Sequence, residues 1–327
     1  MREHPGRRPA PATRGGRPGW AAQSRARGIL LAAVLLALAP FAAAGDEGAE
    51  ELRVAASFTI LAYAAERVGG DRVAVTSLTP VGAEVHEWEL QPRGFRAIED
   101  ADLILYNGYN LEQWMRQVRA AASEDAPLVP VAEASGFPTR AIVTGDFEGD
   151  PDPHLWMDPR AMSAYVEAIR EALAERDPAG AEHYAERASA FQDELAVLHG
   201  ELVERLQAVP EQRRVLITSE AAFPYFAAAY GLEHDGIWGT NAEEEGSPRQ
   251  IMRIVDRIRE RDVPAVFWES TISERYVRSV ADETGVDVAG PLYVDSLSGP
   301  DGPASTYAGM MRHNARIILD ALGEPGE

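Results

Sequence analysis

The 327-residue sequence contains no cysteine, and it contains no lysine either, so all 31 of its basic residues are arginine. Without cysteine, these residues form no disulfide bond, thiolate metal site, cysteine nucleophile or lipid-modified cysteine. Positive charge is also scarce, because 52 acidic residues oppose the arginines and give a formal net charge of −21. Nucleic acid is therefore not an expected partner, since binding to phosphate needs a basic surface.

Only one long apolar run is present, and it lies near the start of the chain. An arginine-rich stretch leads into "ILLAAVLLALAPFAAA", residues 29–44. The run is short for a spanning helix of about 20 residues, and Pro40 interrupts it. It ends in small residues that offer an A-x-A cleavage site before Gly45. We therefore predict a signal peptide at residues 1–44 and a periplasmic protein that is not a lipoprotein and has no stable membrane insertion after cleavage. An uncleaved membrane anchor is the alternative.

The remaining chain alternates strand-like and helix-like segments. "LRVAASF", "RVAVTSL" and "DLILYNG" read as strands in the first half, as do "RRVLITSE" and "PAVFWES" in the second. Helical patterns separate them, which favours an α/β fold with mainly parallel sheets. Between these halves the strands stop, and residues 179–209 read as one helix. We predict two similar α/β lobes, 45–178 and 210–327, joined by one long rigid helix, with the ligand site in the cleft between the lobes.

Four polar residues are candidates for lining this cleft. His86 in "GAEVHEWEL" and His154 in "DPHLWMDP", residues 152–159, lie in loops beside acidic residues. The prolines make the second loop stiff, so His154 reads as a ligand, an acid/base group or a turn residue. Glu220 ends "VLITSE" and Asp295 ends "LYVDS", and ligands of parallel sheets bind outside the carboxyl ends of strands. Each lobe would then supply two groups, unless these are unrelated polar residues at strand ends.

Several motifs in the second half carry a resemblance to a known family. "TSEAAFPYFAAAYGL", "IWGTNAEEEGSPRQI", "FWESTISERYVRSVADETGV" and "LYVDSLS" appear in that order. Together they resemble the metal-binding receptors of zinc/manganese-type ABC importers, and the resemblance runs from about Leu52 to Leu322. It implies a periplasmic, monomeric receptor that works with the membrane permease and ATPase subunits of an ABC importer.

The family's ligand motifs fall on the same four residues. Its histidine in G-x-x-P-H-x-(aromatic)-E corresponds to His86, and its histidine in D-P-H-x-W-x-(D/N)-P corresponds to His154. The ligand after the second lobe's first strand corresponds to Glu220, and the aspartate of the D-S motif corresponds to Asp295. Val85 stands where the family usually has proline, so the first loop is expected to be less rigid. Asp152 and Asp158 are expected to be turn and helix-capping residues rather than ligands.

The donor set favours one divalent transition-metal ion as the transported ligand. The set contains two imidazoles and two carboxylates, and each carboxylate can bind through both of its oxygens. Such an oxygen-rich set suits manganese or ferrous iron, whereas zinc prefers about four tetrahedral ligands. In the resembled family, a glutamate at the third position goes with the manganese/iron branch and a histidine with the zinc branch. The histidine-rich loop of many zinc receptors is also missing before His154. We predict Mn2+, with Fe2+ or Zn2+ next, and a zinc-specific receptor of the same family as the alternative.

Other functions fit the sequence less well. A metal-dependent hydrolase would use the same four residues, but "HEWEL" has Leu90 where the H-E-x-x-H motif needs a second histidine. Four protein ligands would also close the site, while catalytic zinc keeps a position open for water. We therefore expect no enzyme activity. A role in cell adhesion would need a cell anchor. The acidic Glu243-Glu244-Glu245 is expected to be a solvated loop.

Overall fold

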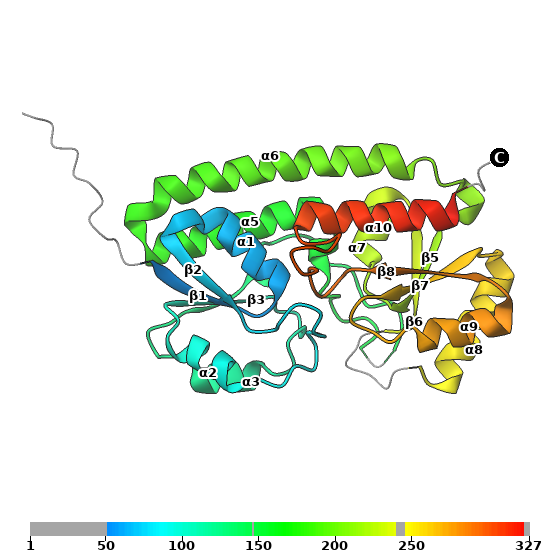
Figure 1. Ribbon diagram of the computed structural model, residues 1–327, viewed down its shortest axis with the longest axis horizontal. Helices are drawn as coiled ribbons and strands as arrows, with labels where there is room; N and C mark the ends of the chain where they lie inside the picture. The colour runs from blue at the N-terminus through cyan, green and yellow to red at the C-terminus, as the bar shows by residue number, and fades with distance from the viewer. Residues whose placement is uncertain (1–50, 146, 240–245, 324–327) are drawn as a thin grey trace, which may run out of the picture. The chain divides into compact units, whose positions relative to one another are not determined.

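The computed structural model describes residues 51–145, 147–239 and 246–323. The predicted signal peptide and the acidic loop Glu243-Glu244-Glu245 lie outside these residues. The described chain consists of two α/β lobes with a long helix, labelled α6, running along them (Figure 1). The fold class is therefore the predicted one.

The first lobe is built on a four-stranded parallel sheet with the strand order β2-β1-β3-β4. Its strands are β1 (Leu52–Ala56), β2 (Val73–Ser77), β3 (Leu103–Tyr106) and β4 (Leu128–Pro130). Its helices are α1 (Thr59–Gly69), α2 (Pro92–Glu99), α3 (Met115–Ala121), α4 (Val131–Ala134) and α5 (Pro159–Arg176). Helices α1 and α5 cover one face of the sheet, and α2 and α3 lie on the other (Figure 1). This cover explains why β3 is apolar throughout, as buried parallel strands are.

The second lobe repeats this arrangement. Its strands are β5 (Val215–Glu220), β6 (Glu233–Trp238), β7 (Ala265–Glu269) and β8 (Asp287–Leu292). Its helices are α7 (Pro224–Tyr230), α8 (Pro248–Arg261), α9 (Arg275–Thr284) and α10 (Tyr307–Leu322). The strands form two parallel pairs, β5-β6 and β7-β8, and β5 lies beside β7. The resulting order β6-β5-β7-β8 matches β2-β1-β3-β4, so the lobes are similar.

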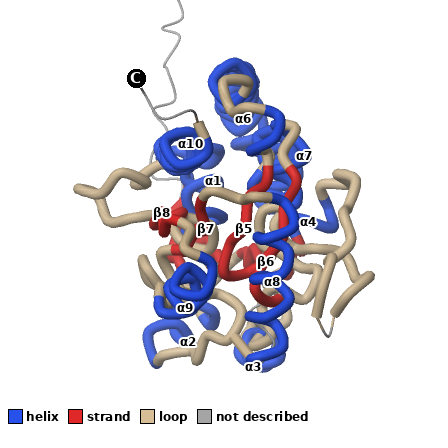
Figure 2. Tube along the Cα trace, turned by 90° about the vertical axis from the view of Figure 1, so that its right-hand side faces the viewer, coloured by secondary structure: helices blue, strands red, loops and turns tan. Residues whose placement is uncertain are grey.

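The long helix α6 spans Ala181–Leu206. Its 26 residues extend about 39 Å at a rise of 1.5 Å per residue. Its buried residues recur every three or four positions, which places them on one face: Tyr184, Ala188, Phe191, Leu195, Leu198, Leu202 and Leu206. This face packs on α1 and α5 in the first lobe and on α7 and α10 in the second. Figure 2 shows α7 and α10 beneath α6.

One apolar core continues through both lobes. It includes Val54 and Leu105 of the first sheet, Leu198 of α6, and Phe226 and Ile318 of the second lobe. Two smaller cores fill the far sides of the sheets, under α2 and α3 in one lobe and under α8 and α9 in the other. The lobes are thus joined by shared packing as well as by the chain.

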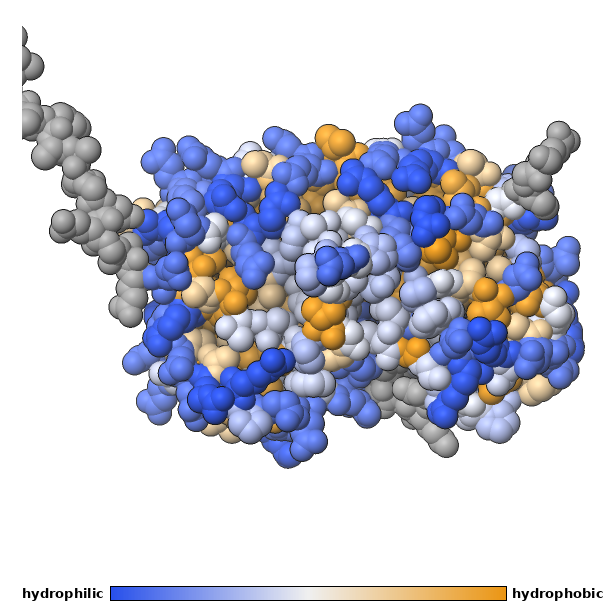
Figure 3. Space-filling model, in the orientation of Figure 1, coloured by the Kyte–Doolittle hydropathy of each residue, from blue (hydrophilic) through white to orange (hydrophobic). Residues whose placement is uncertain are grey.

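Some predicted boundaries differ from the structure. The strand predicted to end at Asp295 ends at Leu292 instead, so Asp295 lies in the loop that follows β8. Strands β4 and β6 were not predicted at all. The face shown in Figure 3 is mostly hydrophilic with scattered apolar patches, and none of the described helices is long and apolar enough to cross a membrane.

Candidate metal centre

The four residues selected from the sequence lie together where the two lobes meet. His86 comes from the loop after β2, His154 precedes α5, Glu220 is the last residue of β5, and Asp295 follows β8. Each offers one ligand atom, and these atoms all lie within 4.8 Å of one another. All four side chains are buried, at 1% exposure or less. The structure therefore brings together residues that are far apart in the sequence and come from both lobes.

Glu220 lies between the two imidazoles. Its Oε1 is 3.3 Å from His86 Nε2 and 3.8 Å from His154 Nε2. On the other side, His154 Nε2 is 4.0 Å from Asp295 Oδ1. His86 Nε2, His154 Nε2 and Asp295 Oδ1 have no hydrogen-bond partner among the described residues. Buried polar atoms without a partner are rare because they are costly, and a cation bound among these atoms would satisfy them.

The stiff turn "DPHLWMDP" fixes the orientation of His154. Asp152 Oδ1 accepts a hydrogen bond from the backbone N–H of His154 at 2.9 Å and lies 3.1 Å from its Nδ1. A carboxylate there holds the proton on Nδ1 and leaves the Nε2 lone pair facing the centre, a common arrangement for metal-bound histidine. Trp156 donates from Nε1 to the carbonyl oxygen of Val294 at 2.9 Å, which ties the turn to the second lobe. Asp158 caps α5. Asp152 and Asp158 thus have the turn and capping roles predicted for them.

The His86 loop is held by hydrogen bonds on both sides of the histidine. Glu84 Oε1 accepts from the backbone N–H of His86 at 2.8 Å. Trp114 donates from Nε1 to the carbonyl oxygen of Val85 at 2.8 Å, and the N–H of Gln113 reaches the carbonyl oxygen of His86 at 3.2 Å. Val85 itself is fully buried. The loop is therefore anchored at Val85, where the family usually has a proline.

Sequence reasoning missed a buried carboxylate, Glu112, that supports the His154 turn. Glu112 Oε1 accepts from Ser57 Oγ at 2.6 Å and from the backbone N–H of Asn107 at 2.7 Å. Asn107 in turn donates from Nδ2 to the carbonyl oxygen of Pro153 at 3.0 Å. The chain of contacts runs from the ends of β1 and β3 to the residue next to His154. No pattern in the helix-like "LEQWM" marks Glu112 as buried.

Sequence reasoning also missed Glu269, a further buried carboxyl beside the centre. It is the last residue of β7, and its Oε1 accepts from the backbone N–H of Glu220 at 3.2 Å. Burial raises the pKa of Glu269 to about 8. A signal for it was present, because "AVFWE" ends in glutamate as "VLITSE" does. The strand-end argument that selected Glu220 applies equally to Glu269.

The protonation of the metal-free centre follows from its burial. Burial, and then the charge of His154, lowers the pKa of His86 well below its usual value. For His154, burial also lowers the pKa, but the nearby carboxylates of Asp152 and Asp295 outweigh it and raise the pKa on balance. Burial raises the pKa of Asp295 to about 7, and the charge of Glu84 adds to this. A bound cation would favour the ionised carboxylate and the neutral imidazole, so binding would release protons.

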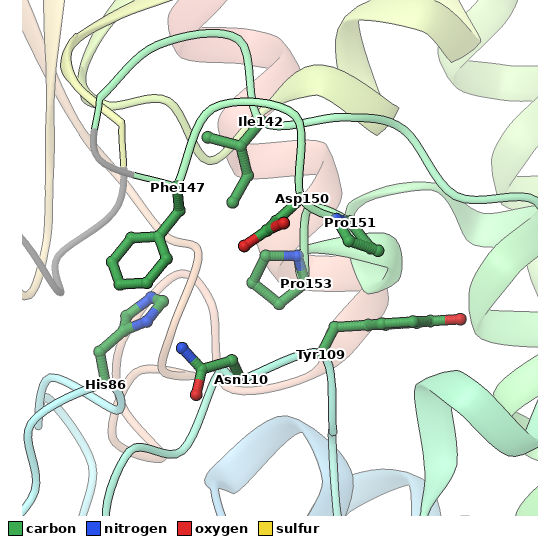
Figure 4. A pocket seen from close by; sticks show the side chains of 8 residues that line it. All are labelled: His86, Tyr109, Asn110, Ile142, Phe147, Asp150, Pro151 and Pro153. Carbon is green, nitrogen blue, oxygen red and sulfur yellow. The ribbon is translucent and has the colours of Figure 1, made fainter.

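A cavity adjoins the centre at His86. It is lined by His86, Tyr109, Asn110, Ile142, Phe147, Asp150, Pro151 and Pro153. In Figure 4, His86 lies near Phe147 and Asn110 at one side of this cavity, and Ile142 lies across from His86. Asp150 and Pro153 lie toward the middle. Of the four residues at the centre, only His86 lines it. Another histidine, His234, lies on β6, where its Nε2 is 2.9 Å from Thr218 Oγ1.

Comparison with known proteins identifies the family. Residues 54–321 match the family described as zinc-uptake complex component A, periplasmic. The chain belongs to this family. The manganese-binding lipoprotein MntA of Halalkalibacterium halodurans is 38% identical over 279 residues, covering 85% of this chain and 91% of MntA. The iron-binding protein YfeA of Yersinia pestis is 39% identical over 279 residues, covering 85% of this chain and 89% of YfeA.

Solved structures agree with this assignment. The periplasmic zinc binding protein TroA from Treponema pallidum is similar with a TM-score of 0.78 and 29% sequence identity, over 84% of this chain and 100% of TroA. The family is one of metal-uptake components, as the resemblance implied. Its relatives are named for different metals, so membership alone does not choose among manganese, iron and zinc.

The predicted localisation is wrong in one respect. We predicted a periplasmic protein that is not a lipoprotein, but MntA and several other relatives are named lipoproteins. The prediction depended on the absence of cysteine, which is a property of this sequence alone and not of proteins of this kind. Receptors of this family include lipid-anchored ones, and the exclusion of a lipoprotein is withdrawn. A location outside the cytoplasm agrees with the family.

Proposed function

We propose that this protein captures one divalent transition-metal ion outside the cytoplasm and delivers it to an ABC importer. The ligands are His86, His154, Glu220 and Asp295. The observation that carries the proposal is the cluster itself: buried nitrogen and oxygen atoms from two lobes lie within 4.8 Å of one another, and three of them have no hydrogen-bond partner among the described residues. One divalent cation would satisfy two imidazole nitrogens and two carboxylates at once.

Manganese is the favoured ion, with ferrous iron next. The two carboxylates supply up to four oxygens, and oxygen-rich sites of high coordination suit manganese and iron better than zinc. Zinc has the greater intrinsic affinity for almost any such donor set and is expected to bind in vitro as well. Selection of manganese then depends on coordination geometry and on which metal is available.

The organisation of the chain and its partners form part of the same proposal. Residues 1–44 act as a signal peptide, residues 45–178 and 210–327 form the two lobes, and residues 179–209 connect them. The extent of α6 and the repeated strand order support this division. The partners are the permease and ATPase subunits of the importer, and the receptor acts as a monomer. A carrier is favoured over a hydrolase because the four protein ligands, with both carboxylates bidentate, fill six positions and leave none for a catalytic water.

Replacement of Glu220 by histidine tests both the site and the metal. Glu220→His exchanges a carboxylate for one nitrogen and leaves three nitrogens and one carboxylate, a set that suits tetrahedral zinc. We expect manganese affinity to fall by about tenfold or more, at about 1.4 kcal/mol for each factor of ten. Zinc affinity should persist or increase. Competitive titration of the two metals against wild type and variant measures both changes.

The matched control is Glu175→His, which makes the same exchange at an exposed position on α5, outside the ligand loops. It should leave both affinities unchanged. Unaltered manganese affinity in Glu220→His would remove Glu220 from the ligand set. A wild-type protein that binds none of the three metals would refute the proposed function.

A further inference from the structure

The loop that follows Asp295 is bonded to the opposite lobe at two points. Ser296 Oγ accepts a hydrogen bond from the backbone N–H of Gly82 at 2.8 Å. The backbone N–H of Leu297 donates to Thr59 Oγ1 at 2.9 Å. Both hydroxyl-bearing residues are buried, Ser296 at 1% and Thr59 at 9% exposure. We call these four residues the interlobe clasp.

The clasp joins two of the proposed ligands across the lobe boundary. Gly82 belongs to the same loop as His86, between β2 and α2, and Ser296 is adjacent to Asp295. The path from Asp295 through the Ser296–Gly82 hydrogen bond to His86 therefore links a ligand of the second lobe to a ligand of the first. Thr59 is the first residue of α1, so the second hydrogen bond ties the same loop to the first lobe's main helix.

The Ser296 hydroxyl makes a second hydrogen bond. It accepts from Gly82 and donates to the carbonyl oxygen of Leu297 at 2.8 Å. Gly82 has a φ of +79°, a conformation that favours glycine, and this turn presents its N–H to the serine. Removing the hydroxyl would leave the Gly82 N–H and the Leu297 carbonyl without this contact.

We propose that Ser296 and Thr59 are positioning residues that hold the two halves of the centre together and control how fast the metal leaves. The role in metal release depends on the proposed function. An ion held by ligands from both lobes leaves only when those ligands separate, and separation at Asp295 and His86 breaks the clasp. The metal-free protein also contains the clasp, so entry and release both require it to open, and loss of the clasp should accelerate both.

Two substitutions remove the clasp, and each has a matched control. Ser296→Ala and Thr59→Val delete one hydroxyl each with little change of shape. Ser298→Ala is the first control, because the bonds of Ser298 Oγ to described residues stay within its own loop, at Gly299 and Ala304. Thr59→Ser is the second control, since it retains the hydroxyl that Leu297 needs.

Hydrogen exchange at the Gly82 amide tests the clasp without any metal. In the metal-free full chain, we expect Ser296→Ala to accelerate exchange at Gly82 by about two- to tenfold, the range for loss of one hydrogen bond. Ser298→Ala should leave this exchange at the wild-type rate. Equal exchange at Gly82 in wild type and Ser296→Ala would overturn the clasp.

The kinetics of metal release test the role of the clasp in the proposed function. The protein is loaded with Mn2+ and mixed with excess chelator, and the release rate is compared with the rate of Mn2+ entry. We expect Ser296→Ala and Thr59→Val to release Mn2+ about three- to tenfold faster, and to take it up no more slowly than wild type. Thr59→Ser and Ser298→Ala should behave as wild type.

Two results would contradict the release role: unchanged release in both clasp variants, or entry slowed as much as release is accelerated. A wild type that takes up no Mn2+, Fe2+ or Zn2+ would overturn the proposed function and the release role together. Faster Gly82 exchange in Ser296→Ala would still establish the interlobe bond in that case, so the two failures can be told apart.

Discussion

At the residue scale, three carboxyl groups are buried at or beside the centre, those of Glu220, Glu269 and Asp295. Burial raises the pKa of Asp295 to about 7 and that of Glu269 to about 8. Both groups therefore hold a proton in the metal-free protein at slightly acidic pH, which limits repulsion between like charges. Under the proposed function, a divalent ion would replace the proton of Asp295. Glu269 contacts the backbone of Glu220, so it supports a ligand and is not itself counted among the four.

These raised pKa values predict that the metal-free protein loses stability as pH rises. A carboxyl whose folded pKa lies above its unfolded value binds its proton more tightly in the folded state, so raising the pH favours unfolding. The window runs from the ordinary values of 3.8 for Asp295 and 4.5 for Glu269 up to about 7 and about 8. The lowered pKa of His86 has the opposite effect near its ordinary value of 6.5, but it is common to wild type and variant. We therefore expect the free energy of unfolding of Glu269→Gln to decrease less across this window than that of wild type. Urea denaturation of the metal-free protein between pH 5 and 8, in steps of about one pH unit, measures the slope.

The control for this prediction is Glu89→Gln, which removes an exposed carboxyl. It should keep the wild-type slope. If Glu269→Gln and wild type lose stability in parallel over the whole window, Glu269 is not protonated in the folded centre.

At the scale of elements, the sequence predicts those helices and strands whose apolar residues follow a strong periodic pattern. The helix α6 was expected because apolar residues recur every three or four positions without a proline. In contrast, β6 begins with the polar "EHD" and was not recognised as a strand. Asp295 was selected for ending a strand that in fact ends at Leu292, but the loop still carries it to the centre. Glu112 could not be predicted, because its role depends on contacts from β1 and β3 that no local pattern records.

The glycine in the middle of α6 offers a direct test of how that helix contributes. Gly200 is exposed, and an added Cβ would meet no atom within 4 Å. Alanine there removes the entropic cost of glycine in a helix, so Gly200→Ala should raise the free energy of unfolding by about 0.5–1 kcal/mol. Metal affinity should not change.

The opposite case is Gly236 on β6, where an added Cβ would meet the backbone of Glu220 and Ala221. Gly236→Ala should destabilise the protein and weaken metal binding, because it displaces the end of β5 that carries Glu220. Thermal unfolding and metal titration of both variants distinguish these outcomes. A stabilising Gly236→Ala would contradict the packing described around Glu220.

At the scale of the whole described chain, the two lobes share an apolar core beneath α6. A wide hinge opening would pull α7 and α10, or α1 and α5, away from this helix and expose apolar surface at about 25 cal/mol for each Å2. The connections at the centre are weaker, because the clasp consists of two hydrogen bonds, each worth about 1 kcal/mol. Motion linked to the metal should therefore be concentrated in the ligand loops and the clasp, while α6 remains a rigid strut.

Small-angle scattering measures whether α6 keeps the two lobes in a fixed arrangement. With α6 intact, curves recorded with and without Mn2+ should almost overlay, because loops that shift locally change the radius of gyration very little. Gly200→Pro supplies the contrast, since proline in a helix interior removes a hydrogen bond and kinks the helix at a cost of about 3 kcal/mol. If that variant folds, its two curves should separate, and Gly200→Ala at the same position should overlay like wild type. Marked compaction of the wild type on metal binding would mean that α6 bends as a hinge and that the shared core does not restrain the lobes.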